Sequence, residues 1–186
     1  MQMNKIIVYG GKGWIGKQFL SVLNNTNKDY VSLNTRIENT EAVENDIKKY
    51  NPTHIISFTG RTHGSIGGKK YSTIDYLEKN GKLKENMRDN LLGPVLLSHI
   101  CKKHRVHYTY LGTGCIFKYD ENHPYEKEES GFKEQDIPNF FGSSYSTVKG
   151  TTDQLLFNLN NETTLNLRIR MPITDIDNPR NFITKI

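Results

Sequence analysis

The chain has 186 residues and a formal net charge of +5, with a sequence pI of about 9.1. This length suits one domain with one sizeable hydrophobic core. The lysines are scattered and form no basic stripe with interleaved aromatic residues, which argues against nucleic-acid binding. We interpret the excess charge as a solvated surface, with attraction of anionic nucleotides as the alternative.

Other features of the composition indicate a soluble protein in a reducing compartment. The two cysteines, Cys101 and Cys115, are too few for a disulfide framework, which favours an intracellular location. No signal peptide begins the sequence, and no apolar stretch approaches the length of a membrane span. The six histidines show no metal-ligand spacing. We therefore expect a cytoplasmic protein without a membrane segment or a metal site.

Apolar runs and helical periodicities alternate along the chain. Strands are predicted at residues 5–9, 30–33, 54–58, 106–111 and 165–169, and helices at residues 17–24, 40–50, 84–104 and 143–158. Two polar connections, residues 60–81 and 120–139, are long enough to be functional. The alternation predicts βαβ units and an α/β fold, a Rossmann-type doubly wound parallel sheet in a single domain over residues 1–186.

A glycine-rich turn separates the first strand from the first helix. Gly10, Gly13 and Gly16 follow one another at three-residue spacing. Backbone without Cβ atoms can approach a pyrophosphate closely, and the following helix N-terminus adds free N–H groups. The position between strand and helix favours a dinucleotide site over an ordinary tight turn. The predicted cofactor contacts are Gly10, Gly13, Trp14, Ile15 and Gly16, with Phe58, Thr59 and Gly60 from the end of the third strand.

The end of the second strand indicates which nicotinamide cofactor is bound. NAD-binding proteins place Asp or Glu there, bonded to the ribose 2′-hydroxyl. Here Leu33 is followed by Asn34, Thr35 and Arg36, so the position has no carboxylate and offers a guanidinium for a 2′-phosphate. The sequence therefore predicts NADPH, with an ordinary surface arginine as the alternative reading of Arg36.

A tyrosine and a lysine four residues apart, Tyr145 and Lys149, lie on one face of the predicted helix 143–158. A phenol with a pKa near 10 is a poor acid–base group at neutral pH, and a nearby cation lowers that pKa. We expect Tyr145 to protonate a carbonyl oxygen as hydride arrives, and Lys149 to support it and to hold the cofactor ribose. An isolated pair usually marks a solvated helix face, but this one follows a dinucleotide turn.

Thr113 and Cys115 come directly after the fourth predicted strand. Ligands of an open parallel sheet bind beyond the carboxyl ends of its strands. We expect Thr113 to hydrogen-bond the substrate carbonyl oxygen. Cys115 has two readings, a small buried residue or a proton-transfer group, whereas Cys101 is interpreted as structural.

Several segments make the chain resemble the extended short-chain dehydrogenase/reductases, in the branch of dTDP-4-dehydrorhamnose reductase and GDP-fucose synthase. It is most similar to the plant-type bifunctional UDP-4-keto-6-deoxy-D-glucose 3,5-epimerase/4-reductases, which make UDP-L-rhamnose. The segments that carry the resemblance are residues 9–16, 113–117, 131–134, 138–140, 145–149, 168–173 and 178–186.

This resemblance implies a reaction in two stages. Carbons C3 and C5 are first inverted through enolates, with Cys115 as one acid–base group and Lys185 where related enzymes have a histidine. Hydride from NADPH then reaches C4, with Tyr145 as proton donor, Thr113 orienting the carbonyl and Lys149 supporting Tyr145. The resemblance also implies substrate contacts from Asn90, Asn139, Phe140 and Asn181, and a cofactor contact from Pro172.

Two other functions fit the same motifs. A plain 4-keto reductase has no need of the Cys115 thiol, and a non-catalytic NADPH-binding regulatory subunit has no need of the Tyr145–Lys149 pair. Family members continue into a C-terminal substrate subdomain, which we expect to be absent or truncated here, with weak substrate binding and low turnover. We expect a nucleotide sugar as the small-molecule partner and a homodimer formed through the helices at 84–104 and 143–158.

Overall fold

The computed structural model describes residues 5–160 and 162–185. The helices are α1 (Trp14–Asn24), α2 (Thr40–Tyr50), α3 (Leu83–Met87), α4 (Gly93–Lys103) and α5 (Ser144–Asn160). The strands are β1 (Lys5–Tyr9), β2 (Asp29–Leu33), β3 (His54–Ser57), β4 (Gly64–Ile66), β5 (Lys69–Tyr71), β6 (His107–Thr113) and β7 (Thr164–Ile169). Within the described ranges, no helix is both long and apolar enough to cross a membrane.

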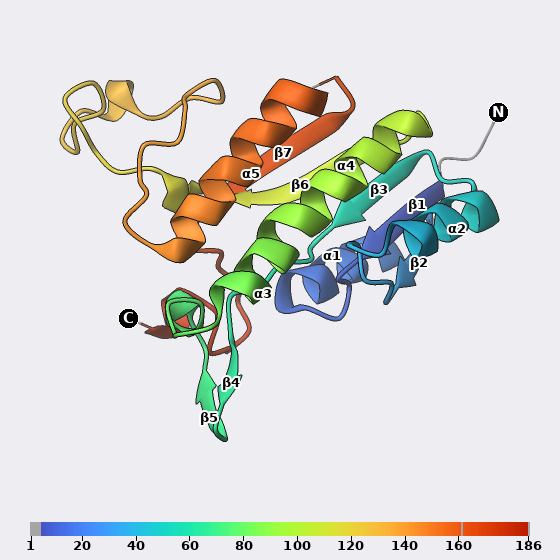
Figure 1. The fold of residues 1–186 in the computed structure, drawn as a ribbon, viewed down its shortest axis with the longest axis horizontal. Coiled ribbons are helices and arrows are strands. Elements are labelled where there is room, and N and C mark those ends of the chain that lie inside the picture. Colours follow the sequence, from blue (N-terminus) through green and yellow to red (C-terminus); the bar gives the residue numbers. More distant parts are fainter. Residues whose placement is uncertain (1–4, 161, 186) are drawn as a thin grey trace.

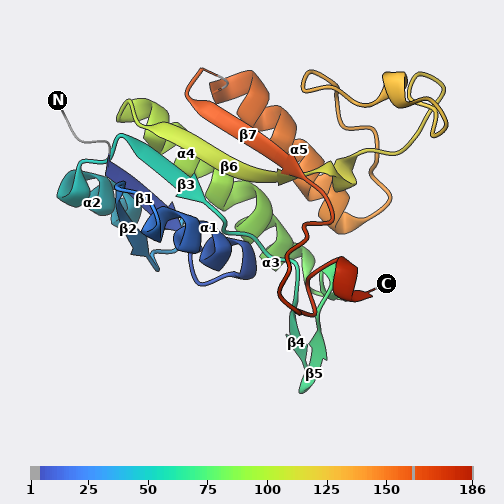
Figure 2. The ribbon, with the colours of Figure 1, turned by 180° about the vertical axis from the view of Figure 1, so that it is seen from behind.

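Five parallel strands form the central sheet, in the order β2-β1-β3-β6-β7. Figure 1 shows α4 and α5 lying across one face of this sheet, and Figure 2, from behind, shows α1 on the opposite face. The predicted Rossmann-type parallel sheet is confirmed. The chain leaves β1 toward β2 on one side and later returns to β3 on the other, so the strand order reverses at β1. Such a reversal opens a crevice at the carboxyl ends of the two strands.

The core lies between the sheet and the helices that cover its front face. Ile7, Ile55 and Tyr108 are fully buried side chains from three neighbouring strands, and they pack in one cluster with Leu97 of α4 and Leu156 of α5. Each such burial contributes about 1.5–3 kcal/mol to folding. This packing fixes the strand ends, and therefore the crevice beyond them, on a rigid platform.

The helix predicted at residues 84–104 is interrupted by a π-helical turn, η2 (Arg88–Leu92), between α3 and α4. Pro94 follows at the start of α4, and its ring nitrogen has no N–H to donate to the preceding turn. Single π-turns of this kind often lie at functional sites. Here the turn carries Asp89 and Asn90, both buried beside the crevice.

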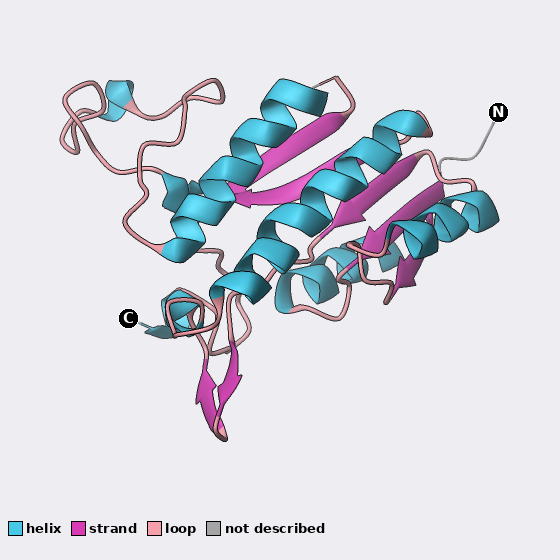
Figure 3. Ribbon diagram, in the orientation of Figure 1, coloured by secondary structure: helices cyan, strands magenta, loops and turns pink. Residues whose placement is uncertain are grey.

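Residues 60–81 were predicted to be a polar connection without strands. The structure instead has an antiparallel hairpin of β4 and β5 within this segment. Gly67 and Gly68 form the turn with φ of +55° and +80°, conformations that favour glycine in two-residue hairpin turns. The glycine pair was the signal in the sequence. Figure 3 shows the hairpin in magenta, projecting from the body of the protein below the sheet.

Candidate active site

The glycine-rich turn brings β1 and α1 against the end of β3. Gly10 has a φ of +78°, and a Cβ atom there would lie 2.8 Å from both the carbonyl carbon of Phe58 and the nitrogen of Thr59. A Cβ at Gly16 would lie 2.3 Å from the carbonyl oxygen of Gly10. Helix α1 begins at Trp14, earlier than predicted, so Gly16 belongs to its first turn. The glycines therefore permit contacts that any other residue would block.

A cavity of about 460 Å³ opens beside this turn. Its lining includes the predicted cofactor residues Gly10, Gly13, Arg36, Phe58, Thr59 and Gly60. Helix α1 has no side-chain cap, so N–H groups of its first turn are left for an anionic ligand. These features fit a dinucleotide. Ile15, Gly16, Lys149 and Pro172 do not line the cavity, and Trp14 lines a neighbouring one.

Arg36 is not the free guanidinium that its sequence position predicted. Its Nη2 atom lies 2.8 Å from both Glu38 and Asp89. Asp89 also accepts from Arg61 at 2.9 Å and from Arg88 at 2.7 Å. Burial pushes the pKa of Asp89 upward, but the hydrogen bonds from Arg88 and Arg61 outweigh it and hold the pKa below its usual value. A 2′-phosphate at this position would compete with the two carboxylates for Arg36.

Thr113, Cys115 and Tyr145 come together at the carboxyl end of β6. The Thr113 hydroxyl accepts a hydrogen bond from the Cys115 backbone N–H at 3.1 Å, where the chain turns into the short helix η3 (Gly114–Ile116). The same hydroxyl contacts the phenol of Tyr145. Cys115, half-buried, packs in the cluster of Tyr145 and Tyr76. A phenol, a hydroxyl and a thiol thus share one small region.

Burial, and then the charge of Cys115, raises the pKa of Tyr145 to about 12, although the hydrogen bond with Thr113 acts in the opposite direction. The side chain is only 7% exposed, so its ionised form loses most of its hydration. Tyr145 therefore holds its proton at neutral pH. That state suits a donor to a carbonyl oxygen.

The recorded hydrogen bonds of Lys149 go to β6, and its predicted support of Tyr145 stays a prediction. Its ammonium donates hydrogen bonds to the hydroxyl of Tyr110 and to the carbonyl oxygen of Leu111, the latter at 3.1 Å. It also lies 4.3 Å from the centre of the Tyr110 ring. Burial lowers the pKa of Lys149 to about 7, against the attraction of Asp153. Lys149 shares a helix face with Tyr145, but the acceptors of its recorded hydrogen bonds lie on β6.

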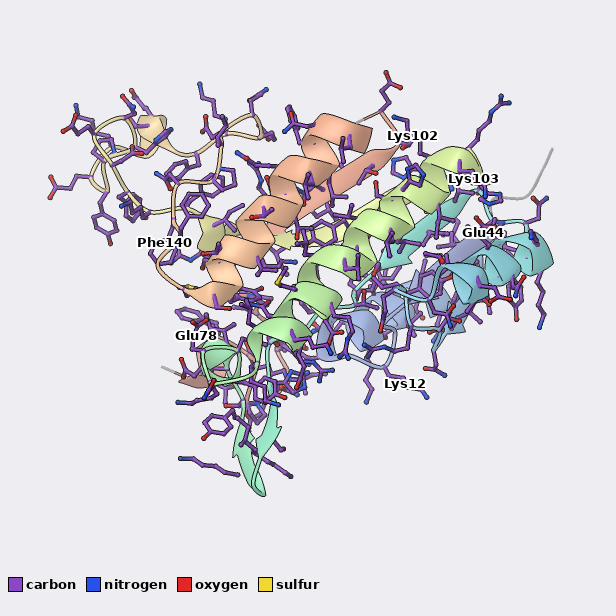
Figure 4. The ribbon with its side chains drawn as sticks, viewed as in Figure 1. Lys12, Glu44, Glu78, Lys102, Lys103 and Phe140 are labelled. Atoms are coloured by element: carbon purple, nitrogen blue, oxygen red, sulfur yellow. The ribbon has the colours of Figure 1, made fainter. Side chains whose placement is uncertain are left out.

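Glu78, which no sequence motif indicated, anchors the start of α5. Its carboxylate accepts hydrogen bonds from the backbone N–H groups of Ser144 at 3.0 Å and Tyr145 at 3.2 Å. A carboxylate at a helix N-terminus satisfies free donors and complements the helix dipole. Figure 4 labels Glu78 close to this end of α5. The contact fixes the backbone of Tyr145 from a residue far away in the sequence.

The three predicted substrate-binding asparagines use their amides to brace loops. Asn90 accepts from the Arg61 N–H at 2.9 Å and donates to the Arg61 carbonyl at 2.8 Å. Asn139 likewise accepts a hydrogen bond from the Lys118 N–H and donates one to the Lys118 carbonyl oxygen. Asn181, 3% exposed, donates to the carbonyl of Thr174 at 2.8 Å. These amides shape the crevice, and contacts with a substrate remain predictions.

The remaining predicted residues have varied surroundings. Phe140, labelled in Figure 4, is half-buried just before α5, and its ring fills the space where a Cβ of Gly142 would lie. The side chain of Lys185 lies outside the described part of the structure, so its role stays a prediction. Cys101 is fully buried in the core and its pKa is raised by burial, as a structural thiol requires.

Two relatives with matching sequences are enzymes of nucleotide-sugar metabolism. The chain is 51% identical to a UDP-rhamnose synthase from Acanthamoeba polyphaga mimivirus, whose crystal structure superposes with a TM-score of 0.88 over 98% of this chain and 61% of that one. It is 38% identical to a trifunctional UDP-glucose 4,6-dehydratase/UDP-4-keto-6-deoxy-D-glucose 3,5-epimerase/UDP-4-keto-L-rhamnose-reductase from Arabidopsis thaliana, covering 98% of this chain and 26% of the relative.

A more distant structure shows the same fold. The dTDP-4-dehydrorhamnose reductase of Bacillus anthracis, solved with NADP, is 20% identical, with a TM-score of 0.76 over 100% of this chain and 59% of that one. The chain thus spans about 60% of the length of two of these relatives and about a quarter of the third. A profile of the NAD dependent epimerase/dehydratase family matches residues 6–174. With the sheet order, the glycine turn and the Tyr145–Thr113 contact, this match places the chain in the NAD dependent epimerase/dehydratase family.

Proposed function

We propose that the chain carries the catalytic centre of an NADPH-dependent enzyme that converts UDP-4-keto-6-deoxy-D-glucose to UDP-L-rhamnose by 3,5-epimerisation and 4-reduction. The observation that carries the proposal is the convergence of Thr113, Cys115 and Tyr145 at the end of β6. Strand β6 is the neighbour of β3 in the sheet, and the residues that follow β3 line the dinucleotide cavity. The mimiviral relative, a UDP-rhamnose synthase, supports the product, and the epimerase and reductase activities of the plant relative support the substrate.

For reduction, the bound NADPH supplies hydride. The Thr113 hydroxyl orients the C4 carbonyl oxygen, and Tyr145 gives it a proton from a phenol that burial keeps protonated at neutral pH. Lys149 is hydrogen-bonded to Tyr110 and Leu111 of β6 and has a pKa of about 7, so it can hold or release a proton near neutral pH. The Glu78 carboxylate keeps the Tyr145 backbone in place during this transfer.

For epimerisation, a base must remove the protons next to the 4-keto group. Cys115 is partly exposed and adjoins Tyr145, so its thiolate can take such a proton and its thiol can return one. The carbonyl oxygen held by Thr113 carries the enolate charge meanwhile. Lys185 is retained as the proposed second acid–base group.

NADPH is favoured over NADH because the three residues directly after β2, Asn34, Thr35 and Arg36, include no carboxylate, and Arg36 lines the cavity. The neighbouring Arg61 also lines the cavity, so two guanidinium groups face a bound 2′-phosphate. Glu38 and Asp89 argue against NADPH, because they already neutralise part of the positive charge of Arg36 and Arg61.

We infer a homodimer from one further feature, and a cytoplasmic location from the two free cysteines. An apolar groove lies along α3, η2 and α4, next to Leu155 of α5. Leu83, Met87 and Leu92 in this groove are 56%, 46% and 49% exposed. A second copy packing here would bury them.

The decisive experiment follows both half-reactions in D2O. The chain, at a concentration above that of the substrate, is mixed with UDP-4-keto-6-deoxyglucose and NADPH, and deuterium at C3 and C5 and the consumption of NADPH are measured. Cys115→Ala is compared with Cys101→Ala, which removes a thiol from the core. We expect the Cys115 variant to lose deuterium uptake and the Cys101 variant to keep it.

Each alternative function predicts a different result. NADPH consumption without deuterium uptake in the unmodified chain would establish a plain reductase. NADPH binding with neither signal would establish a regulatory subunit. Deuterium uptake that survives in Cys115→Ala would remove the assigned role of the thiol.

A further inference from the structure

Tyr76 is a buried tyrosine to which the proposed reaction gives no role. It lies at the end of the short helix η1 (Ile74–Tyr76), which follows the β4–β5 hairpin. Tyr76 packs in one buried cluster with Leu77 and Tyr145, and Cys115 packs against this cluster. The proposed proton donor and the thiol therefore share their apolar surroundings with a second phenol.

The hydroxyl of Tyr76 is fixed by an ion pair. It donates a hydrogen bond to Glu85 of α3 at 2.7 Å, and Lys82 donates to the other oxygen of the same carboxylate at 2.7 Å. The Lys82 ammonium also lies 4.9 Å from the centre of the Tyr76 ring. The hydrogen bonds from Lys82 and then from Tyr76 hold the pKa of Glu85 below its ordinary value, so this acceptor is charged at neutral pH. The hydroxyl is thus occupied, and it orients the ring.

The ring of Tyr76 lies against the backbone of the hairpin, which Figure 1 shows below α3. A Cβ atom at Gly64, the first residue of β4, would lie 2.3 Å from Cζ of Tyr76, and 2.5 and 2.7 Å from two further ring carbons. Only a residue without a side chain leaves room for the ring here. Tyr71 of β5 adds a second ring, whose centre is 6.4 Å from that of Tyr76. The hairpin and α3 together therefore hold Tyr76 in place.

The elements that hold Tyr76 also hold the backbone around Tyr145. Glu78, two residues after Tyr76, accepts a hydrogen bond from the Tyr145 N–H. Asn86, the neighbour of Glu85 in α3, is fully buried and donates to the hydroxyl of Ser144 at 2.8 Å. The side chain and the backbone of Tyr145 thus depend on the same short segments.

We propose that Tyr76 is a positioning residue for Tyr145, whose fixed ring keeps water from the Tyr145 phenol and couples the β4–β5 hairpin to it. Burial is the largest cause of the raised pKa of Tyr145, so a side chain that supplies part of this burial controls how firmly the proton is held. The inference rests on the proposed function only for the statement that Tyr145 gives this proton to a substrate.

Three variants change the Tyr76 ring in different ways. Tyr76→Phe keeps the ring and loses the hydroxyl, and Tyr76→Ala removes the ring. Gly64→Ala displaces the ring with a new Cβ atom and leaves every residue of the cluster in the chain. All three leave unchanged the other titratable groups that face Tyr145 from η3, β6, β5 and α5 and from the segment after η1, which are Cys115, Tyr110, Tyr71, Lys149 (through Tyr110) and Glu78.

The test titrates Tyr145 by NMR of protein labelled with carbon-13 at the tyrosine Cζ atoms, with the signal assigned through its loss in Tyr145→Phe. We expect the pKa of Tyr145 to fall from about 12 by about one unit in Tyr76→Ala and in Gly64→Ala, because the ionised phenol gains water. It should change little in Tyr76→Phe, which retains the ring. Ile66→Ala, at an exposed position on the same strand as Gly64, is the control and should leave it unchanged.

An unmoved titration of Tyr145 in both Tyr76→Ala and Gly64→Ala would overturn the inference. If Tyr76→Ala does not fold, Gly64→Ala alone decides. An equally large fall in Tyr76→Phe would also overturn it, because the hydroxyl and not the ring would then be responsible.

Single-turnover oxidation of NADPH separates this inference from the proposed function. We expect the rate to fall about tenfold in Tyr76→Ala and to be largely retained in Tyr76→Phe, since a displaced donor transfers its proton less readily. If the titration moves while the unmodified chain never oxidises NADPH with the keto sugar, the positioning role stands and the proposed reaction does not. If the reaction proceeds and the titration is unmoved, the reaction stands and the positioning role does not. NADPH affinity should be unchanged in each variant, since neither Tyr76 nor Gly64 lines the dinucleotide cavity.

Discussion

In the interior between α5 and β6, the ammonium of Lys149 donates a hydrogen bond to the hydroxyl of Tyr110. Tyr110 is 1% exposed, and its side chain has no other cation beside it among the described residues. The acceptor stabilises the charged form of an amine that burial drives toward neutrality. Tyr110 is therefore a positioning residue for Lys149.

Replacing Tyr110 by Phe should lower the pKa of Lys149 further, because the buried charge loses one acceptor. If reduction requires charged Lys149, activity falls as pH rises through that pKa, and the fall should move to lower pH by about half a unit to one unit. The measurement is the pH dependence of the single-turnover rate of NADPH oxidation. Tyr108→Phe, on the same strand and equally buried, is the control and should leave the profile in place. A uniformly slower rate with an unmoved profile would refute the assignment.

Lys149→Met should make the protein more stable while removing its activity. The folded-state pKa of about 7 lies below the ordinary value of 10.5, so folding must release a proton or bury a charge at neutral pH. Replacing such a charge with an apolar side chain gains about 1–4 kcal/mol. The gain should be full below pH 7 and shrink between pH 7 and 10, where the lysine of the folded protein is already neutral. Urea unfolding at several pH values measures it, and a gain that grows with pH would contradict the argument.

Glu78→Gln should weaken the start of α5. Losing a charged cap costs about 1 kcal/mol of unfolding free energy and loosens the backbone of Tyr145. We expect a lower rate of reduction with little change in NADPH affinity, since Glu78 does not line the dinucleotide cavity. Glu121→Gln, in an exposed loop, is the matched charge control. Equal kinetics in the two variants would show that the cap has no catalytic consequence.

Two glycines with the same backbone conformation should respond differently to alanine. Gly10 and Gly81 both have a φ of +78°, which costs an alanine about 1–2 kcal/mol. A Cβ at Gly81 meets nothing within 4 Å, whereas one at Gly10 would lie 2.8 Å from backbone atoms of Phe58 and Thr59. Gly10→Ala should therefore cost more stability than Gly81→Ala and should abolish NADPH binding. Denaturant unfolding and fluorescence titration with NADPH distinguish the two, and equal losses would contradict the steric argument.

The proposed dimer interface can be tested with a single charge. Met87→Glu places a carboxylate in the apolar groove along α3, where a partner would have to bury it. Light scattering after gel filtration should then report a monomer. Val22→Glu, on α1 and 60% exposed, is the control and should leave the dimer unchanged. A monomer before any substitution would exclude the homodimer.

Local motifs were predictable, and contacts between distant segments were not. The glycine spacing and the strand alternation depend on neighbouring residues, and both are confirmed in the fold. The position of Thr113 followed from the end of its strand. Glu78 and Tyr110 act on residues 67 and 39 positions away, so no short pattern reveals them. The expected support of Tyr145 by Lys149 stays a prediction. The helix spacing could not reveal that the recorded hydrogen bonds of Lys149 go to acceptors on a strand.

The ion pairs of Arg36 could not be predicted from the sequence either. The sequence predicted the position of Arg36 after β2. Its partners Glu38 and Asp89 lie in two different segments, and only the fold brings Asp89 next to Arg36. The hairpin was visible in principle through Gly67 and Gly68, although its strands are too short for an alternating pattern to stand out.

The π-turn at residues 88–92 sets the orientation of α3 relative to α4. It holds one residue more than an α-helical turn would, so α3 is rotated relative to α4 by about 100° from a regular continuation. The turn carries Asp89, which lines the dinucleotide cavity, and Asn90 next to it. Deleting one residue here would give a smoother and more regular helix, and it would carry the exposed leucine and methionine of α3 away from the groove. The irregular turn therefore sets the orientation of both the crevice wall and the proposed subunit contact.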